Sequence, residues 1–199
     1  MTHGGYKALF WFLIGTFFWV HHLANSPRAL PPGPVVREEP EQTLIEGGKP
    51  WLLKGYTITP LATYRIRARV LRTERYHFDR ESELSPEDLA LGWRSMSDSA
   101  NLKRLSISQG GRWYYFHYRQ APLADEDILA HSSNNHMIPG NPEVASTLKK
   151  IQVDHIIRAQ GYLVAVQGKD GYRWQSSLSR TDTGARSCEL FWTDRLEIE

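Results

Sequence analysis

The longest uninterrupted apolar run lies near the N-terminus, where residues 8–20 read ALFWFLIGTFFWV without a charge. A helix rises about 1.5 Å per residue, so this run alone spans about 20 Å of a hydrocarbon core about 30 Å thick. A helix extended over residues 6–24 would be long enough to span the core, if Lys7 reaches the interface and the two histidines are neutral. The pattern predicts a transmembrane anchor over residues 1–25. A cleavable signal peptide and a buried core helix are the alternatives, and His22 disfavours cleavage after Ala24.

Residues 26–50 are rich in proline and glycine, which favours an extended, semi-rigid spacer over a packed element. Residues 51–199 then form one globular soluble domain. Long downstream domains translocate largely regardless of charge, so we expect the N-terminus inside and this domain outside. In a bacterium, that is a single-pass protein of the cell inner membrane with a periplasmic C-terminal domain.

Strict alternation over residues 64–70 predicts a strand with two different faces. Ile66, Ala68 and Val70 form the apolar face. The other face carries Arg65, Arg67 and Arg69. Such a stripe can bind anions, but a solvated strand face is the favoured interpretation because charges of both signs follow it. The phase breaks at Val70, which indicates a bulge.

Further strands are expected where short apolar runs alternate with turn signals. The run over residues 156–166 is apolar on both faces and predicts a central strand, in which Gly161 indicates a bulge or a close backbone approach. Two hairpins are expected, one over 104–118 around Gly110 and Gly111, and one around Asp170 and Gly171. Shorter strands are predicted at 51–58, 172–178 and 187–198.

Three short helices have recognisable start signals. Ser85-Pro-Glu-Asp88 has an N-cap, a proline at the first position and an acid at the third, which predicts a helix ending near Gly92. Residues 122–129 predict a helical turn, and Asn141 followed by proline predicts a helix to residue 151. The predicted fold class is therefore α+β, mostly β. It is a small, strongly bent antiparallel sheet or an OB-like partly open barrel, with two or three short helices and the N-terminal transmembrane helix.

Composition narrows the function classes. The 199 residues suit one domain with appendages, and 7 Trp with 9 Tyr favour a β-rich fold. A net charge of +2 is too small to imply a nucleic-acid partner. The single cysteine, Cys188, excludes an intramolecular disulfide and a multi-cysteine zinc site. No pattern indicates a cofactor.

Residues 131–139, HSSNNHMIP, hold the densest group of side chains that could perform chemistry. A spacing of five residues keeps His131 and His136 off one helix face, so the helical zinc motif is absent. In a loop they could converge on a metal with an acid or His155. The favoured interpretation is a tight loop without metal, shaped by Asn134 and Asn135.

Two further groups could contribute to a site. Cys188 with a histidine and an asparagine would supply the roles of a thiol nucleophile, its base and its orienter, although a buried inert thiol is more common in a strand. Ser177, Arg180 and Asp182 could bind a phosphate or carboxylate. The alternative is a polar loop in which Asp182 caps amides and pairs with Arg180.

The last group is aromatic and lies in the predicted strands. Aromatic side chains on a barrel face can stack on sugars or bases, although most of these should be core. Its members are Trp113, Tyr114, Tyr115, Phe116, Trp174 and Trp192.

The segments HSSNNHMIP, GYLVAV, WQSSLSRTDTG and SCEL, in this order, resemble a family of uncharacterised membrane-anchored bacterial proteins. The resemblance covers residues 64–198. It implies the location and a single fold, with no activity attached.

We therefore expect a non-catalytic periplasmic domain that binds or assembles with another envelope component, most simply a protein. The alternative is a hydrolase or metal-assisted enzyme that uses His131 and His136. The expected site joins these histidines to Asn134, Asn135 and the loop that follows Ser177.

Overall fold

The computed structural model describes residues 11–16, 19, 30–179 and 188–199. Residues 11–16 are helical. Among the described residues, no helix has the length and apolar character needed to span a membrane.

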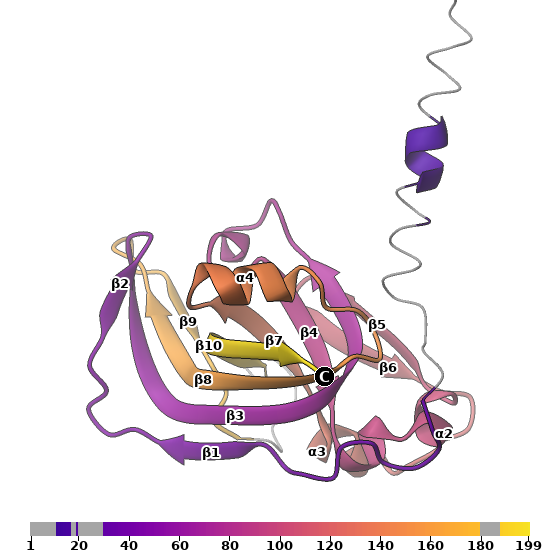
Figure 1. Cartoon of the computed structure of the whole chain (residues 1–199). Coiled ribbons are helices and arrows are strands. Elements are labelled where there is room, and N and C mark those ends of the chain that lie inside the picture. The colour runs from indigo at the N-terminus through magenta and orange to yellow at the C-terminus, as the bar shows by residue number, and fades with distance from the viewer. Residues whose placement is uncertain (1–10, 17–18, 20–29, 180–187) are drawn as a thin grey trace, which may run out of the picture.

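Strands dominate the fold, with a few short helices between them (Figure 1). The strands are β1 (Glu41–Leu44), β2 (Trp51–Leu53), β3 (Tyr56–Arg75), β4 (Glu87–Gly92), β5 (Ser106–Gly110), β6 (Trp113–His117), β7 (Ser132–Pro139), β8 (Ile156–Gln167), β9 (Arg173–Gln175) and β10 (Glu189–Ile198). The helices are α2 (Ser99–Leu102), α3 (Asp125–Ala130) and α4 (Pro142–Leu148), with 3-10 turns η1 (Glu81–Glu83) and η2 (Arg94–Ser97).

The main sheet closes on itself into a ring. Its strand order is β1-β3-β4-β7-β10-β8-β9, and β3 also pairs with β8. The closed part therefore runs through β3, β4, β7, β10 and back through β8. Its ladders are antiparallel except the β7–β10 pair, which is parallel. The predicted mostly β, strongly bent sheet with few short helices is confirmed at this level.

The ring closes because β3 is long and bent. It has 20 residues and pairs with β8 over most of its length and with β4 near its C-terminal end. Register shifts between Pro60 and Ala62, and between Val70 and Arg72, mark two irregular points along it. The break predicted at Val70 is thus present.

The core fills the inside of this ring. Ile66, Ala68 and Val70 are buried there, and α4 adds Val144 and Leu148 from the side. The other face of the same stretch of β3 carries the arginines, as the alternation predicted. Burial of these aliphatic side chains provides the main driving force for closure.

Several local predictions are confirmed. The expected hairpin of β5 and β6 is present, with Gly111 and Arg112 as its turn residues directly after Gly110, and β8 is a central strand. Asn141 caps α4, since its Oδ1 accepts the Val144 N–H at 2.9 Å. A Cβ at Gly161 would lie 2.0 Å from the Trp192 carbonyl oxygen, so the expected close backbone approach is also present.

Two predicted elements are wrong. Residues 85–92 do not form a helix but lead into β4, in which all six residues are buried between β3 and β7. Residues 131–139 do not form a loop: His131 ends α3, and residues 132–139 form strand β7, which lies between β4 and β10. In both segments, ladders to neighbours on two edges outweigh local capping and turn preferences. These neighbours are distant in the sequence.

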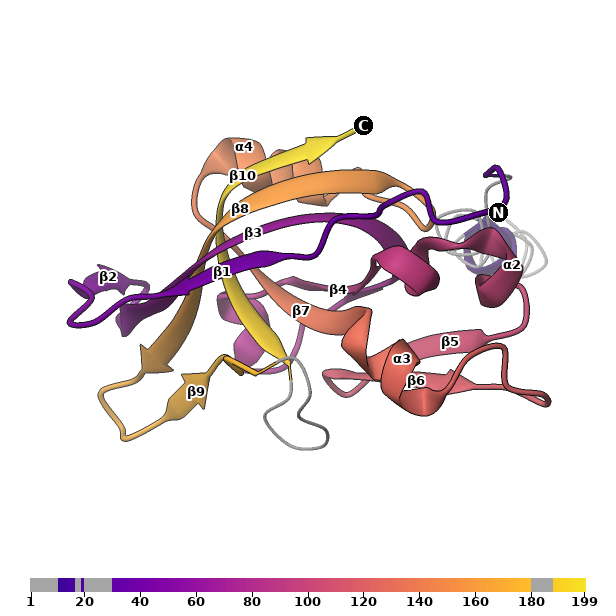
Figure 2. The same ribbon diagram turned by 90° about the horizontal axis from the view of Figure 1, so that it is seen from below.

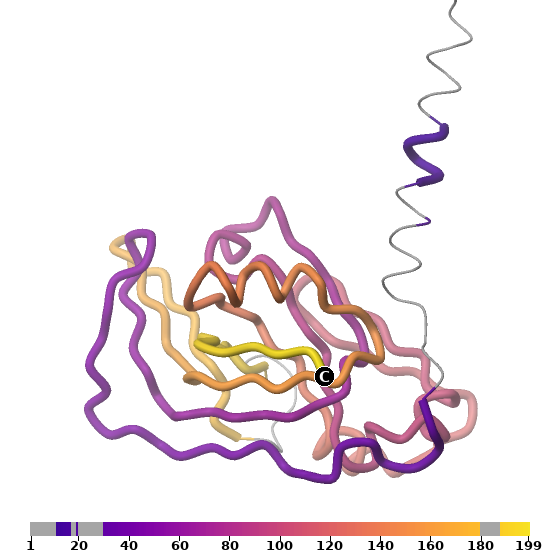
Figure 3. The backbone as a smooth tube through the Cα atoms, viewed as in Figure 1, coloured from indigo at the N-terminus to yellow at the C-terminus, as the bar shows by residue number. Residues whose placement is uncertain are grey.

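The second half of the expected spacer belongs to the folded part (Figure 3). Val36 is fully buried in the core, and its N–H donates to Ser97 Oγ at 3.0 Å. Residues 41–44 pair with β3 as β1. Proline density suggested a stretch without packing, but single apolar side chains between the prolines anchor it to the sheet.

The arginine stripe also divides. Arg65 and Arg67 lie on the surface of β3 in ion pairs, whereas Arg69 is only 3% exposed. Its guanidinium donates to Asp154 Oδ1 at 2.6 Å and to the Ser97 carbonyl at 2.9 Å. This buried pair ties β3 to the turn before β8.

Removing the charge of Asp154 tests this tie. Because Asp154 has a backbone φ of 69°, asparagine is the substitution that tolerates the conformation. We expect Asp154→Asn to lower the free energy of unfolding by about 2–4 kcal/mol, because it leaves the Arg69 charge buried and uncompensated. Urea denaturation at neutral pH measures the loss. Glu197→Gln, which breaks an exposed pair with Arg195, should change stability little. Equal losses in both variants would contradict the interpretation.

Candidate functional site

A buried polar network joins three elements on the outer face of the ring. Asp88 of β4 and His136 of β7 are directly opposite in the ladder, so their side chains share a face. His136 Nδ1 lies 2.9 Å from Asp88 Oδ2, although the contact lacks hydrogen-bond alignment. Arg112, from the turn of the β5–β6 hairpin, donates to Asp88 Oδ1 at 2.8 Å. Asp88 thus faces two cationic or potentially cationic groups.

Arg112 fixes the hairpin turn to the segment that precedes β4. Its Nε and Nη2 both donate to Asp79 at 2.8 Å, and its guanidinium lies 3.7 Å from the centre of the Tyr76 ring. The Tyr76 hydroxyl accepts the Arg112 backbone N–H at 3.0 Å. These contacts hold a residue whose φ is 71°, a left-handed conformation.

The protonation of this network follows from its contacts. Burial disfavours the Arg112 charge, but hydrogen bonds to Asp79 and the charge of Asp88 outweigh burial and raise the pKa of Arg112. The same hydrogen bond lowers the pKa of Asp79. Burial raises the pKa of Tyr76 to about 12. Arg112 and Asp79 are therefore charged, and Tyr76 is neutral, throughout the physiological range.

A cleft of about 820 Å³ lies above this network. Trp174 of β9 lies over the His136 ring, with the two ring centroids 5.0 Å apart. In the described part of the chain, Nε2 of His136 has no hydrogen-bond partner, and the residue lines the cleft. The described residues around the cleft are Arg112, Trp113, His136, Arg173, Trp174, Gln175, Ser176, Ser177, Leu178, Ser179 and Cys188.

Four predicted site residues come together here. Asn134 lies two positions from His136 on the same face of β7, and its Nδ2 is 3.8 Å from Cys188 Sγ. The Ser177 N–H donates to the Cys188 carbonyl at 3.0 Å. His136, Ser177 and Cys188 therefore border one cleft, and Asn134 adjoins it through Cys188, because β7 and β10 run parallel and place residues 134 and 188 at the same level.

Other predicted residues lie elsewhere. His131 ends α3, where its Nδ1 is 2.8 Å from Ser95 Oγ and 3.2 Å from Asp127 Oδ1. Asn135 points to the opposite face of β7 and donates to Ser133 Oγ at 2.9 Å. Among the described residues, His131 and His136 share no partner. Arg180 and Asp182 fall outside the described residues.

No group of three or more metal-ligating side chains occurs within the described ranges. The two histidines, whose convergence on a metal was the less favoured alternative, are separated because residues 132–139 form a strand. In a strand, successive side chains alternate between faces.

Asp88, Arg112 and Asp79 are the central residues that the sequence did not reveal. Asp88 resembled a helix-capping acid, and Arg112 followed a glycine turn without any recognisable motif. An arginine directly after two glycines is the available signal, since it falls in the hairpin turn and its side chain can extend away from the two strands. Its acidic partners, at positions 79 and 88, could be identified only from the fold.

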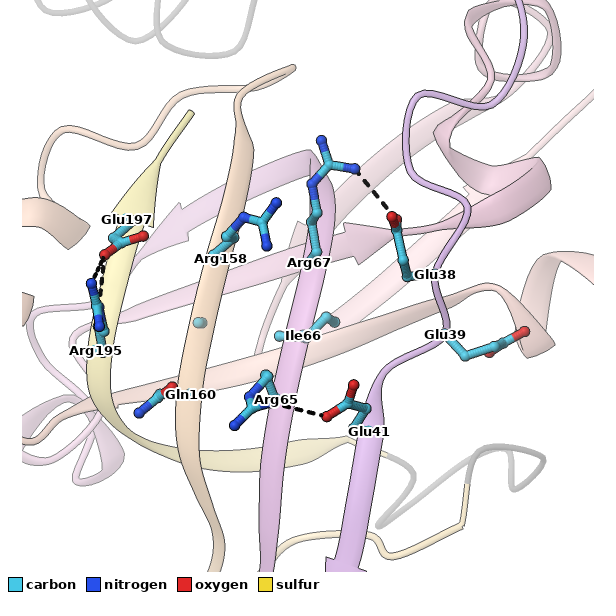
Figure 4. A pocket seen from close by; sticks show the side chains of 11 residues that line it. Glu38, Glu39, Glu41, Arg65, Ile66, Arg67, Arg158, Gln160, Arg195 and Glu197 are labelled. Carbon is cyan, nitrogen blue, oxygen red and sulfur yellow. Dashed lines mark hydrogen bonds and ion pairs between the residues drawn. The ribbon is translucent and has the colours of Figure 1, made fainter.

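A second hollow, of about 340 Å³, lies on the outer face of β3, β8 and β10 (Figure 4). Arginines and glutamates line it and compensate one another. Arg65 pairs with Glu41 at 3.3 Å, and Arg195 pairs with Glu197 at 2.6 Å. Further pairs join Arg67 to Glu38 and Glu199, and Arg158 to Glu199. This surface is an ion-paired strand face, as the favoured interpretation of the stripe expected.

Glu87 is the buried acid next to the network. It is 2% exposed on β4 and pairs with Arg75 at 3.2 Å. Burial raises its pKa to about 7, and the Arg75 charge offsets only part of this effect. The folded protein therefore binds this proton more tightly than the unfolded chain does.

This difference predicts a pH-dependent loss of stability. The unfolded carboxyl titrates near pH 4.5 and the folded one near 7, so stability falls as pH rises between these values. We expect Glu87→Gln to be more stable than the parent at pH 8, by about 1–3 kcal/mol, and to lose this advantage at pH 4. Urea denaturation at both pH values measures it, with the exposed Glu46→Gln as control. A difference independent of pH would contradict the assignment.

Comparisons with protein-family models, with curated proteins and with solved structures found no match for this chain.

Proposed function

We propose that this protein is a membrane-anchored binding domain that holds another envelope component in the cleft above Asp88 and His136, without catalysing a reaction. The observation that carries the proposal is the cleft itself, with a prearranged polar floor and two tryptophans in its lining. The single-pass anchor and the periplasmic location belong to the same proposal. They rest on the apolar run at residues 8–20.

We also infer that the ring is an OB-type barrel. The five-strand ring, the long bent β3 and helix α4 on the β7–β8 connection support this inference. Barrels of this type bind ligands on the face of their second and third strands and on the flanking loops. In this ring those strands are β4 and β7, which carry Asp88 and His136. The resemblance to an OB-type barrel supports the location of the binding site and does not identify the ligand.

The electrostatics of the floor favour binding over catalysis. Arg112 already donates to both Asp79 and Asp88, so these two acids compensate its charge and it is not available to a reacting substrate. His131, the second histidine of the enzymatic alternative, contacts other groups outside the cleft. A rigid floor lowers the entropy cost of binding, because little has to be ordered when the ligand arrives.

A site-specific crosslink in native membranes tests the proposal. With a photoreactive amino acid at Gln175, which is exposed and lines the cleft, we expect the full-length chain to form a discrete adduct. The same amino acid at Glu143, exposed on α4, serves as the matched position. Arg173→Glu or Trp174→Ala should abolish the adduct from position 175. Absence of an adduct, or an adduct that neither variant weakens, would overturn the proposal.

A second candidate, nucleophilic catalysis, has one observation in its favour. Asp88 lies against Nδ1 of His136, which leaves Nε2 on the side of the cleft that Cys188 also lines. An acid beside a histidine that shares a cleft with a thiol supplies the residue types of an activated nucleophile.

Thiol alkylation separates the two candidates. For a binding domain, we expect the Cys188 thiol in the folded protein to react with iodoacetamide no faster than free cysteine at pH 7. A thiol activated by His136 would react at least about tenfold faster and would lose that advantage in His136→Gln. The pH profile of the alkylation rate, measured for both proteins, decides between them.

A further inference from the structure

The outer face of the β5–β6 hairpin carries a row of uncovered aromatic rings. Alternation along β6 sends Tyr114 and Phe116 inward, where they pack against the buried cluster around Met96 and Ile128. The outward residues are Trp113, Tyr115 and His117, and the first two are 37% and 46% exposed. In the second view the hairpin lies on the outer side of β4 and β7 (Figure 2).

Small residues on β5 leave these rings uncovered. The cross-strand partners of Trp113, Tyr115 and His117 are Gly110, Ser108 and Ser106. A larger partner would lie against each ring, since directly opposite side chains are about 5 Å apart. The rings therefore form a row with steps of about 7 Å, which is twice the rise per residue of a strand.

The segment that forms and flanks this row is basic, whereas the first turn of the following helix α3 carries Asp125, Glu126 and Asp127. Residues 99–124 contain no aspartate or glutamate. Lys103, Arg104 and Arg119 are exposed, and none has an ion pair within the described residues. The next acid in the sequence, Asp125, accepts the Tyr118 hydroxyl at 2.6 Å. This surface differs from the ion-paired hollow of Figure 4, where arginines face glutamates.

The cations gather at one end of the hairpin. Ser106 pairs with His117, so Arg104 and Arg119 extend from the same end, away from the Gly110 turn. At the turn end, Arg112 is occupied by Asp79 and Asp88. These three cations favour an anionic partner whose charge lies mainly at the open end.

β6 also offers an open backbone edge. Among the described residues it forms a ladder only with β5. An extended peptide can add to such an edge through main-chain hydrogen bonds, with alternate side chains on one face. Alternate side chains of an extended polypeptide repeat at about 7 Å, which matches the row of rings, whereas stacked bases repeat at about half that spacing.

We propose that the β5–β6 hairpin is the docking surface for an extended acidic segment of a partner protein. The segment adds to the edge of β6. Its acidic end faces Lys103, Arg104 and Arg119, and its alternate side chains contact the rings of Tyr115 and Trp113. The inference deepens the proposed binding function and rests on it, because Trp113 also lines the cleft.

Selection from a library of short random peptides against the full-length chain tests the proposal. We expect the recovered peptides to be enriched in aspartate and glutamate towards one end. Arg104→Glu and Tyr115→Ser should each weaken their binding about tenfold or more, measured by fluorescence anisotropy. Lys150→Glu, the same charge reversal at an exposed site beyond α4, should leave binding unchanged. Both hairpin side chains are exposed, so an unchanged melting temperature verifies that the variants fold.

The outcomes separate this inference from the cleft. Peptides that depend on Arg173 and Trp174 but not on Arg104 and Tyr115 would overturn the hairpin surface and leave the cleft proposal standing. Recovery of no peptide, or of peptides without acidic residues, would also overturn the hairpin surface. An oligothymidylate that binds more tightly than any peptide, and is weakened by the same two variants, would replace it with a nucleic-acid platform. Dependence on Arg104 and Tyr115 alone supports the hairpin surface whatever the cleft binds.

Discussion

The fold depends on β3 pairing with β4 and with β8, since these two ladders close the ring. A straight strand of this length could not pair on both sides of a closed sheet, because closure requires the strands to bend and tilt. The register shifts along β3 lie at the places where its partners change or slip. Gly161 of β8 permits a similarly tight approach, since its missing Cβ leaves room for the Trp192 carbonyl. The cleft exists only because this closure brings β4, β7 and the start of β10 side by side.

Much of this architecture could be predicted where a signal is local. Asn141 announces α4 because a cap bonds within its own turn, and alternation around Ile66 identifies the two faces of β3 because pleating is a property of one strand. The helix predicted over residues 85–92 was wrong because a capping pattern reports only the local preference of the backbone. The two ladders of β4 involve residues more than ten positions away. Stabilisation by partners distant in the sequence exceeded the local preference. This is the usual reason why strands are mispredicted from local sequence patterns.

The candidate site was half predictable for a related reason. His136, Asn134, Ser177 and Cys188 were singled out by residue type, and they do meet. His131 and Asn135 were included because a loop imposes no alternation, whereas the observed strand sends Asn135 to the other face. Arg112 was missed because its role depends on Asp79 and Asp88, which reach it only after the hairpin has docked. Residue types thus indicated which chemistry was possible, and the fold determined which of these residues lie together in the site.

Arg112 connects the two surfaces of this domain. A buried charged network is costly to assemble, so we infer that this one is retained for the single geometry that it fixes. Here the fixed geometry is that of the hairpin turn, and Trp113 follows Arg112 directly in the chain. The same tryptophan begins the exposed aromatic row of β6 and borders the cleft above His136. A partner on the hairpin and a ligand in the cleft would therefore contact one side chain held by one arginine. We infer that a change in the contacts of Arg112 would alter both surfaces at once, because Trp113 belongs to both.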